Sequence, residues 1–317
     1  MNKLVRELLP FGSLILIIAI LSLWLPDSFL TVDNFLNVLR RSSVYGIIAV
    51  GMTFVIISGG IDLSVGSLLA LCGMCAAGTM IGRGATPSVG MMALGTALGL
   101  LSGAVGGLVS GALITKLKLQ PFIATLGTMS LYRGIALVMY DGQPINVSSY
   151  RYLGEGSLLG IPISVVLFLA VIAFAGAVLH FTRFGRHTYA IGSNVEAAHH
   201  AGVRVDRTLI GIYTLGGLLT GLAAMIAMSR TVSAQPTAGV GAELDVIAAV
   251  VIGGASLSGG RGTVTGTIVG TLLISFLRNG CTLVGISTNA QLIVIGVVIV
   301  LAVAVDQFTR RQAGDGA

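Results

Sequence analysis

Two charged residues in or beside apolar segments are the first candidates for chemistry in this sequence. Asp62 lies where one apolar stretch ends and the next begins, and Arg133 lies within a later stretch. If these stretches span a membrane, ionisable groups at that depth are functional candidates. A structural role accounts for each equally well, because Asp caps helix N-termini and the long Arg133 side chain can reach the membrane surface. Both interpretations stay open.

The thiol and imidazole side chains do not indicate a metal or redox site. Cys72 and Cys75 form a Cys-x-x-Cys pair inside an apolar run, without a second pair or a nearby His, and we expect small packing residues there. A Gly-x-x-x-x-Gly-Lys-Ser/Thr motif is absent, so the chain cannot cradle phosphates as P-loop proteins do. We therefore expect no metal and no cofactor on this chain.

The composition places most of the chain in lipid. Of 317 residues, 55% are hydrophobic and only 9% are charged, and the mean hydropathy is +0.97. A soluble domain of this length needs more charge on its surface, and a disordered chain needs low hydrophobicity. The predicted fold class is therefore all-α, a polytopic membrane protein. The net charge of +6 is scattered over separate loops and does not indicate nucleic-acid binding.

Apolar runs long enough to cross a bilayer predict about ten transmembrane helices. The predicted crossings are 11–25, 44–58, 63–81, 89–115, 122–140, 161–181, 209–228, 245–255, 263–278 and 289–305. Cytoplasmic loops are enriched in Lys and Arg. If the N-terminus is cytoplasmic, most Lys and Arg residues of this chain lie on the cytoplasmic side, here called inside. The inside set is Lys3, Arg6, Lys116, Lys118, Arg183, Arg186, Arg204, Arg207, Arg261, Arg310 and Arg311; the outside set is Arg40, Arg41, Arg83, Arg151, Arg230 and Arg278. We therefore expect both termini and residues 182–208 in the cytoplasm, and residues 141–160 and 229–243 outside.

A short repeated sequence marks two interruptions between apolar segments. Residues 58–66 read Ser-Gly-Gly-Ile-Asp-Leu-Ser-Val-Gly, and residues 252–260 read Ile-Gly-Gly-Ala-Ser-Leu-Ser-Gly-Gly. The similarity points to an internal repeat in which each new helix starts after a capping residue, Asp62 or Ser256. Broken helices at corresponding places can mark a transport path, whereas glycine pairs also make simple tight turns. The candidate pathway or helix-break residues are Gly59, Gly60, Asp62, Ser64, Arg133, Gly253, Gly254 and Ser256.

Glycines at a spacing of four predict that two helices lie inside a bundle. Glycines at this spacing lie along one face of a helix. Close packing against another helix is the first interpretation of this glycine face, and the lining of a pore is the second. The glycines are Gly95, Gly99, Gly103, Gly107 and Gly111 in the fourth predicted helix, and Gly262, Gly266 and Gly270 in the ninth.

Residues 182–208 form the longest predicted cytoplasmic loop, and their sequence predicts a short helix that could dock on a partner. Asn194 or the preceding serine can cap the helix, Glu196 suits its first turn, and Gly202 can end it. We expect the small side chains of Ala197, Ala198 and Ala201 to form a smooth docking face. A surface helix without a partner is the simpler alternative.

The sequence resembles the permease subunits of ATP-binding-cassette (ABC) importers for ribose, xylose, arabinose and related sugars, the ribose type most of all. The similar stretches are residues 51–66, 120–127, 233–239 and 245–262. Glu196-Ala-Ala-x-x-x-Gly202 is also similar to the start of the coupling-loop motif of such permeases, although Val203-Arg-Val-Asp replaces its apolar-Pro ending. Within the 233–239 stretch, Gln235 and Pro236 are candidate residues of the outer face.

The resemblance implies a type II-like importer permease of the bacterial inner membrane, with residues 1–317 as one transmembrane domain. It also implies three partners: an ABC ATPase subunit that holds ATP and Mg²⁺ and receives the coupling loop, a periplasmic sugar-binding protein, and a second permease copy in a homodimer or related heterodimer. The implied function is translocation of a monosaccharide, a pentose or hexose, driven by ATP. A stand-alone secondary carrier and a channel are the competing functions. The absence of a ladder of acids and histidines across the membrane argues against a proton-coupled carrier.

Overall fold

The computed structural model describes residues 3–81 and 87–314, and these residues are mostly helical. The longer helices are α1 (Lys3–Trp24), α3 (Val32–Ile57), α4 (Val65–Ile81), α5 (Val89–Lys116), α6 (Pro121–Val138), α8 (Ile163–Phe181), α11 (Val205–Thr231), α13 (Val264–Leu283) and α14 (Thr288–Gly314). The shorter ones are α2 (Pro26–Phe29), α7 (Tyr152–Glu155), α9 (Arg183–Ser193), α10 (Val195–His200) and α12 (Ala242–Ile252). The four strands have two residues each and form two antiparallel pairs. β1 (Ile145–Asn146) pairs with β4 (Ser233–Ala234), and β2 (Ser157–Leu158) pairs with β3 (Ile161–Pro162).

Six of the described helices are long and apolar enough to cross a membrane: α3, α5, α6, α8, α11 and α13. Three shorter apolar segments, Pro10–Trp24, Val65–Ile81 and Thr288–Val298, coincide with predicted crossings. The eighth predicted crossing corresponds to α12, which at 11 residues measures only about 16 Å, roughly half of a bilayer core. The number of ten crossings therefore stays a prediction.

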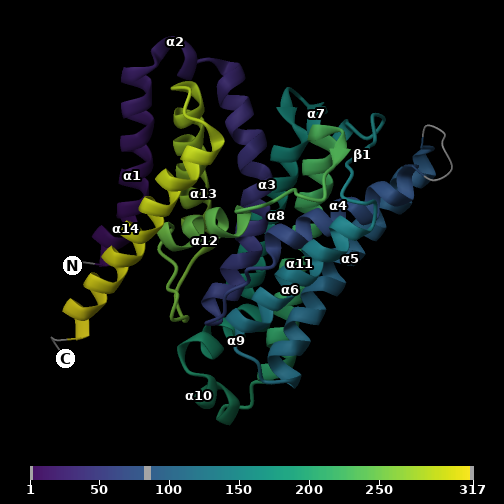
Figure 1. Cartoon of the computed structure of the whole chain (residues 1–317). Coiled ribbons are helices and arrows are strands. Elements are labelled where there is room, and N and C mark those ends of the chain that lie inside the picture. Colours follow the sequence, from purple (N-terminus) through teal and green to yellow (C-terminus); the bar gives the residue numbers. More distant parts are fainter. Residues whose placement is uncertain (1–2, 82–86, 315–317) are drawn as a thin grey trace.

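The helices form two groups on either side of α3 (Figure 1). In one group α11 packs against α5 and α4, α6 packs against α4, and α8 packs against α3. In the other group α13 packs against α1 and α12, and α14 lies beside them. Helix α10 lies at one end of the molecule, whereas α2, α7 and β1 lie at the opposite end (Figure 1).

Glycines bring α5 and α11 into backbone contact. A Cβ atom on Gly103 would overlap the carbonyl oxygen of Gly217, and a Cβ on Gly107 would overlap that of Tyr213. Gly270 on α13 is pressed in the same way against Ala249 of α12. The glycine faces of both helices are thus packing faces, as the sequence predicts, because any side chain would separate the helix backbones. The opposite face of α5 is exposed, as at Leu94, Leu101 and Val105, so α5 lies at the surface of the bundle and not inside it as predicted.

Several basic residues assigned to outer loops lie in helices instead. Arg40 and Arg41 belong to α3, which begins 12 residues earlier than predicted because Thr31 accepts a hydrogen bond from the Asn34 amide and caps it. Arg230 lies in the last turn of α11, and Arg278 lies buried in α13. Arg83 and the two chain ends, residues 1–2 and 315–317, lie outside the described residues.

Candidate functional site

The first glycine turn joins α3 to α4 around the buried carboxylate of Asp62. Helix α3 ends in a Schellman motif, in which the amides of Gly59 and Gly60 donate to the carbonyls of Ile56 and Val55. Gly59 has φ +84°, the left-handed conformation that this motif requires. Oδ1 of Asp62 then accepts from the amide of Ser64 at 2.8 Å and from its hydroxyl at 2.6 Å. Asp62 therefore fixes the backbone that leads into α4, and it lies three residues before the first helical residue, Val65.

The second glycine turn ends its helix with the same motif, but the sequence alignment of the two turns is one residue out of register. Here the amides of Gly254 and Ala255 donate to Val251 and Val250, and Gly254 has φ +92°. Gly254 is therefore the counterpart of Gly59, whereas the sequence repeat pairs Gly59 with Gly253.

Ser256 does not cap the helix that follows the second turn, contrary to the sequence prediction. Helix α13 begins at Val264, and its cap is Thr263, whose Oγ1 accepts from the Gly266 amide at 3.0 Å. Ser256 lies within the turn, where its amide donates to the Arg261 carbonyl and its hydroxyl lies 3.2 Å from that of Ser258. The prediction failed because the second turn is longer than the first, and its extra residues separate the repeated serine from the new helix.

Helix α9, which the sequence analysis did not predict, ends against both turns. A Cβ on Gly192 would overlap the carbonyl oxygen of Ile57 and lie 2.6 Å from the amide nitrogen of Gly260. That amide donates to the same Ile57 carbonyl at 2.8 Å, which joins the two turns directly. Tyr189 of α9 adds a hydrogen bond from its hydroxyl to the Gly262 carbonyl at 2.7 Å. Only a glycine at position 192 permits this three-way contact.

Helix α10 follows α9 directly and is the short helix that the sequence predicts. Oδ1 of Asn194 accepts from the Ala197 amide at 2.9 Å and caps its first turn. Gly202, with φ +82°, follows the C-terminus, and Val203 completes a Schellman motif by donating to the Ala198 carbonyl.

One residue expected on the docking face of α10 lies on the opposite side. Ala198 is only 4% exposed and packs inward. Val195, Glu196, Ala197 and Ala201 are exposed and form the outward surface. The alanine pattern alone could not distinguish the two faces of so short a helix.

Arg133 joins α6 to the segment that follows β4, at the end of the molecule away from α10. Its guanidinium donates to the carbonyls of Pro236 at 2.6 Å and Ala238 at 2.8 Å. Pro236 is buried and Gln235 is exposed. Arg133 therefore positions the segment that contains Pro236 and Ala238, and it lies far along α6 from the turn that holds Asp62.

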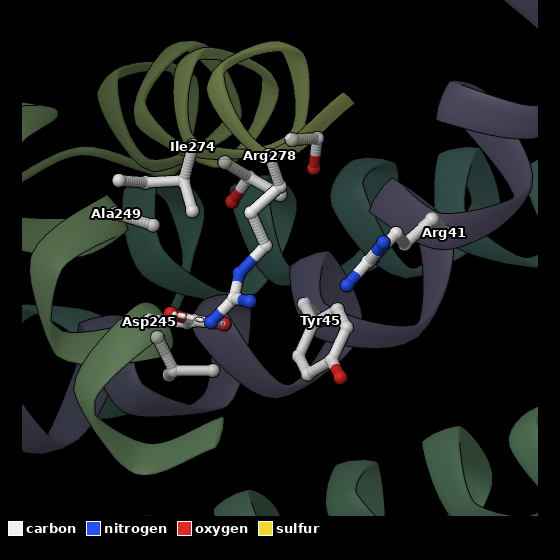
Figure 2. A pocket seen from close by; sticks show the side chains of 9 residues that line it. Arg41, Tyr45, Asp245, Ala249, Ile274 and Arg278 are labelled. Atoms are coloured by element: carbon white, nitrogen blue, oxygen red, sulfur yellow. Dashed lines mark hydrogen bonds and ion pairs between the residues drawn. The ribbon is translucent and has the colours of Figure 1, made fainter. Parts of the chain in front are cut away.

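A buried ion pair, which the sequence analysis missed, fixes α12 to α13. Nη2 of Arg278 lies 2.8 Å from each carboxylate oxygen of Asp245, and both side chains are less than a tenth exposed. Arg41 and Tyr45 of α3 face this pair across a small hollow (Figure 2). The signal available from the sequence was that one acid and one base lie in adjacent apolar segments, although their 33-residue separation does not specify a pair.

Comparisons with known proteins establish the family of the chain. A family model described as "Branched-chain amino acid transport system / permease component" matches residues 34–303. The chain belongs to this permease family. Among curated proteins, the ribose import permease protein RbsC of Bacillus subtilis is 48% identical and the match covers 96% of this chain and 94% of that protein. RbsC of Escherichia coli K12 is 46% identical, with 93% and 91% covered. The E. coli D-allose transport system permease protein AlsC is 36% identical, with 95% and 91% covered.

No solved structure gives a significant match to this permease. Within residues 3–81 and 87–314, no group of three His, Cys, Asp or Glu side chains is arranged to hold a metal ion. The candidate site of the permease consists of two helix breaks, joined to each other and to the segment that presents α10.

Proposed function

We propose that this permease is the membrane-spanning subunit of an ABC importer that translocates a monosaccharide, ribose or a related pentose or hexose. A periplasmic binding protein delivers the sugar, and a separate ATPase subunit docks on α10 and supplies the energy. Two permease copies, or two related permeases, enclose the path in the bacterial inner membrane. The proposal for the sugar is supported by relatives named for ribose and D-allose import or transport.

The observation that carries the proposal is the contact of Gly192 with both glycine turns. Helix α10 exposes one side beyond the bundle, and its preceding helix ends on the carbonyl of Ile57 and the amide of Gly260. A force applied to α10 by a docked ATPase would therefore reach α3, α4, α12 and α13 through one rigid contact. A carrier or a channel working alone has no need for such a connection.

The arrangement of the helices supports a membrane orientation with α10 in the cytoplasm. The start of α1 and the end of α14 both point away from the end of the molecule that carries α2 and α7, which is the end opposite α10 (Figure 1). Arg183, Arg186, Arg204 and Arg207 flank α10, and basic residues favour the cytoplasm.

Cysteine labelling tests this orientation in intact cells. Single cysteines at Ser149 and Ser233 should react with an impermeant thiol reagent, whereas a cysteine at the exposed Ser193 should react only after the cells are permeabilised. Labelling in the reverse pattern would overturn the orientation.

Reconstitution tests the function itself. The permease is placed in liposomes with and without the candidate ATPase and binding protein, and uptake of labelled D-ribose, D-xylose, L-arabinose and D-allose is measured. We expect concentrative uptake only when the permease, both partners and ATP are present. Uptake by the permease alone, either down a sugar gradient or driven by an ion gradient, would establish a channel or a secondary carrier instead.

A further inference from the structure

A cavity of about 460 Å³ lies between α3, α4, α11 and the segment that follows β4. Small-molecule pockets in proteins measure roughly 300–1,000 Å³. Arg230 lies in the last turn of α11, so the cavity lies at the end of the bundle opposite α10. Arg41 and Tyr45 are half-buried in its wall, and Gln235 is exposed beside it.

The polar groups of the cavity offer hydrogen bonds that the protein does not use. Among the described residues, neither Arg41 nor Arg230 has a hydrogen bond or ion pair with another side chain or with the backbone. No acidic residue lines the cavity. The nearby carboxylate of Asp245 is already bonded to Arg278. Both arginines therefore line the cavity with side-chain donors that no other protein group is seen to accept.

The rest of the wall is formed mostly by small side chains. Gly73, Ala224 and Ala227 are examples, and a Cβ atom on Gly73 would meet only the Cβ of Ala234, at 3.8 Å. The wall therefore leaves room for a compact ligand and gives it few apolar contacts.

We propose that this cavity is a monosaccharide site of the permease, in which Arg41, Arg230, Tyr45 and Gln235 hydrogen-bond the hydroxyl groups of the sugar. This inference rests on the proposed function. Guanidinium and amide groups donate to hydroxyl oxygens, and Gln235 and Tyr45 also accept from hydroxyl hydrogens. The ring of Tyr45 offers the cavity an aromatic surface beside these groups.

The composition of the site suits transient binding of a transported sugar. A transport site must bind well enough for the substrate to enter and weakly enough for it to leave. Four polar side chains on three separate elements, in a wall formed otherwise mostly by small side chains, meet this requirement. The buried ion pair between Asp245 and Arg278 fixes α12, and through it the segment 233–241, which closes the cavity on one side.

Protection of a cysteine tests binding without requiring transport. Ser233→Cys places a thiol in the cavity wall, and its rate of alkylation is measured in the purified permease with its partners. Millimolar D-ribose should slow the reaction, whereas it should leave the rate at Ser149→Cys unchanged, because Ser149 is exposed at the same end of the molecule but does not line the cavity. The parental chain, with its own three cysteines, gives the background.

Kinetics of uptake test the named side chains. Arg230→Gln and Gln235→Ala should each raise the KM for D-ribose by about 2- to 10-fold, the equivalent of one lost hydrogen bond. The matched control is Arg151→Gln, which removes an exposed arginine at the same end, outside the cavity. Gly73→Leu should block uptake by filling the cavity, whereas Gly176→Leu, on α8 with open space beside it, should not.

The two proposals fail in different ways. If the parental complex imports D-ribose with ATP, but the sugar does not protect Ser233→Cys and the KM values do not change, the cavity is not the site. If inorganic phosphate protects the cysteine and D-ribose does not, the two arginines bind an anion and the sugar assignment is wrong. If D-ribose protects the cysteine but ATP drives no uptake, the site stands and the importer function fails.

Discussion

The two glycine turns of this permease end their first helices in the same way and begin their second helices differently. Gly59 and Gly254 both adopt a left-handed conformation in a Schellman motif. After the first turn, α4 begins eight residues beyond the end of α3, and the buried carboxylate of Asp62 organises the connection. After the second turn, α13 begins 12 residues beyond the end of α12, and Gly259, Gly260 and Gly262 all have positive φ.

Both turns contact neighbouring helices, and the buried side chain of Asp62 additionally fixes the first turn. The first turn is largely buried, and Thr125 of α6 also donates to its Ile61 carbonyl at 3.2 Å. The second turn is more exposed and depends on contacts with α9, through Tyr189 and Gly192. We therefore expect the second turn to respond more to changes in α9.

The largest expected effect comes from Gly192→Ala, which breaks the contact shared by the two turns. The added Cβ overlaps the Ile57 carbonyl, so α9 must move away from both turns. We expect ATP-driven uptake of D-ribose in proteoliposomes to fall by about tenfold or more, since overpacking costs roughly 1–3 kcal/mol and a coupled contact is lost. Gly176→Ala, whose added Cβ meets open space, serves as the control. If Gly192→Ala transports at the parental rate, the contact of Gly192 with the two turns is not needed for transport.

Substitution of Asp62 tests the side chain that distinguishes the first turn. Asp62→Leu leaves the Ser64 amide without its acceptor in a buried site, at a cost of about 1–3 kcal/mol in the free energy of unfolding. Asp62→Asn keeps a carbonyl oxygen at the same place and should keep most of the stability and transport. Unfolding in detergent and uptake are measured together. If Asn abolishes uptake while assembly stays intact, the charge of Asp62 has a transport role beyond this structural one.

Alanine at the left-handed glycines should affect the two turns equally. Gly59→Ala and Gly254→Ala each place a Cβ in open space, so only the positive φ opposes them. Each should cost about 1–2 kcal/mol in the free energy of unfolding. A much larger loss for one of them in detergent unfolding would show that the two helix ends are not equivalent.

Tyr189→Phe should give the smallest effect and should act on the second turn alone. It removes the hydrogen bond to the Gly262 carbonyl and keeps the ring, at a cost of about 0.5–1.5 kcal/mol. Hydrogen exchange measured by mass spectrometry should increase in residues 253–263 and stay constant in residues 58–64. Equal increases in both segments would contradict the distinction between the turns.

The sequence predicted the helices well because apolar runs and glycine spacing are local signals. Most predicted bounds lie within a few residues of the observed ones, and α10 has the cap and the terminal glycine that its sequence indicates. Helix α9 was missed because its residues are polar and follow a strongly apolar segment. Its start signal was Thr182, whose hydroxyl accepts from the Gly185 amide.

The contacts that build the site could not be predicted, because they join residues far apart in the chain. The sequence gives no reason for Gly192 to meet both Ile57 and Gly260. Arg41 and Arg230 were assigned to loops as topology markers, and only the packing of α3, α4 and α11 places them at one cavity. The sequence repeat also aligned the two turns one residue out of register, because identical residues in an alignment do not determine which glycine adopts a positive φ.

Docking of the ATPase on α10 is the claim that one measurement tests most directly. Ala197→Arg puts a bulky charge on the exposed side of α10, outside the membrane bundle, and Ser149→Arg makes the same change at the opposite end. The permease is purified from cells that also express the ATPase, and the bound ATPase and the ATP-driven uptake of D-ribose are measured. We predict loss of both for Ala197→Arg, with normal insertion, and parental values for Ser149→Arg. If Ala197→Arg retains the ATPase and imports at the parental rate, α10 is not the docking element.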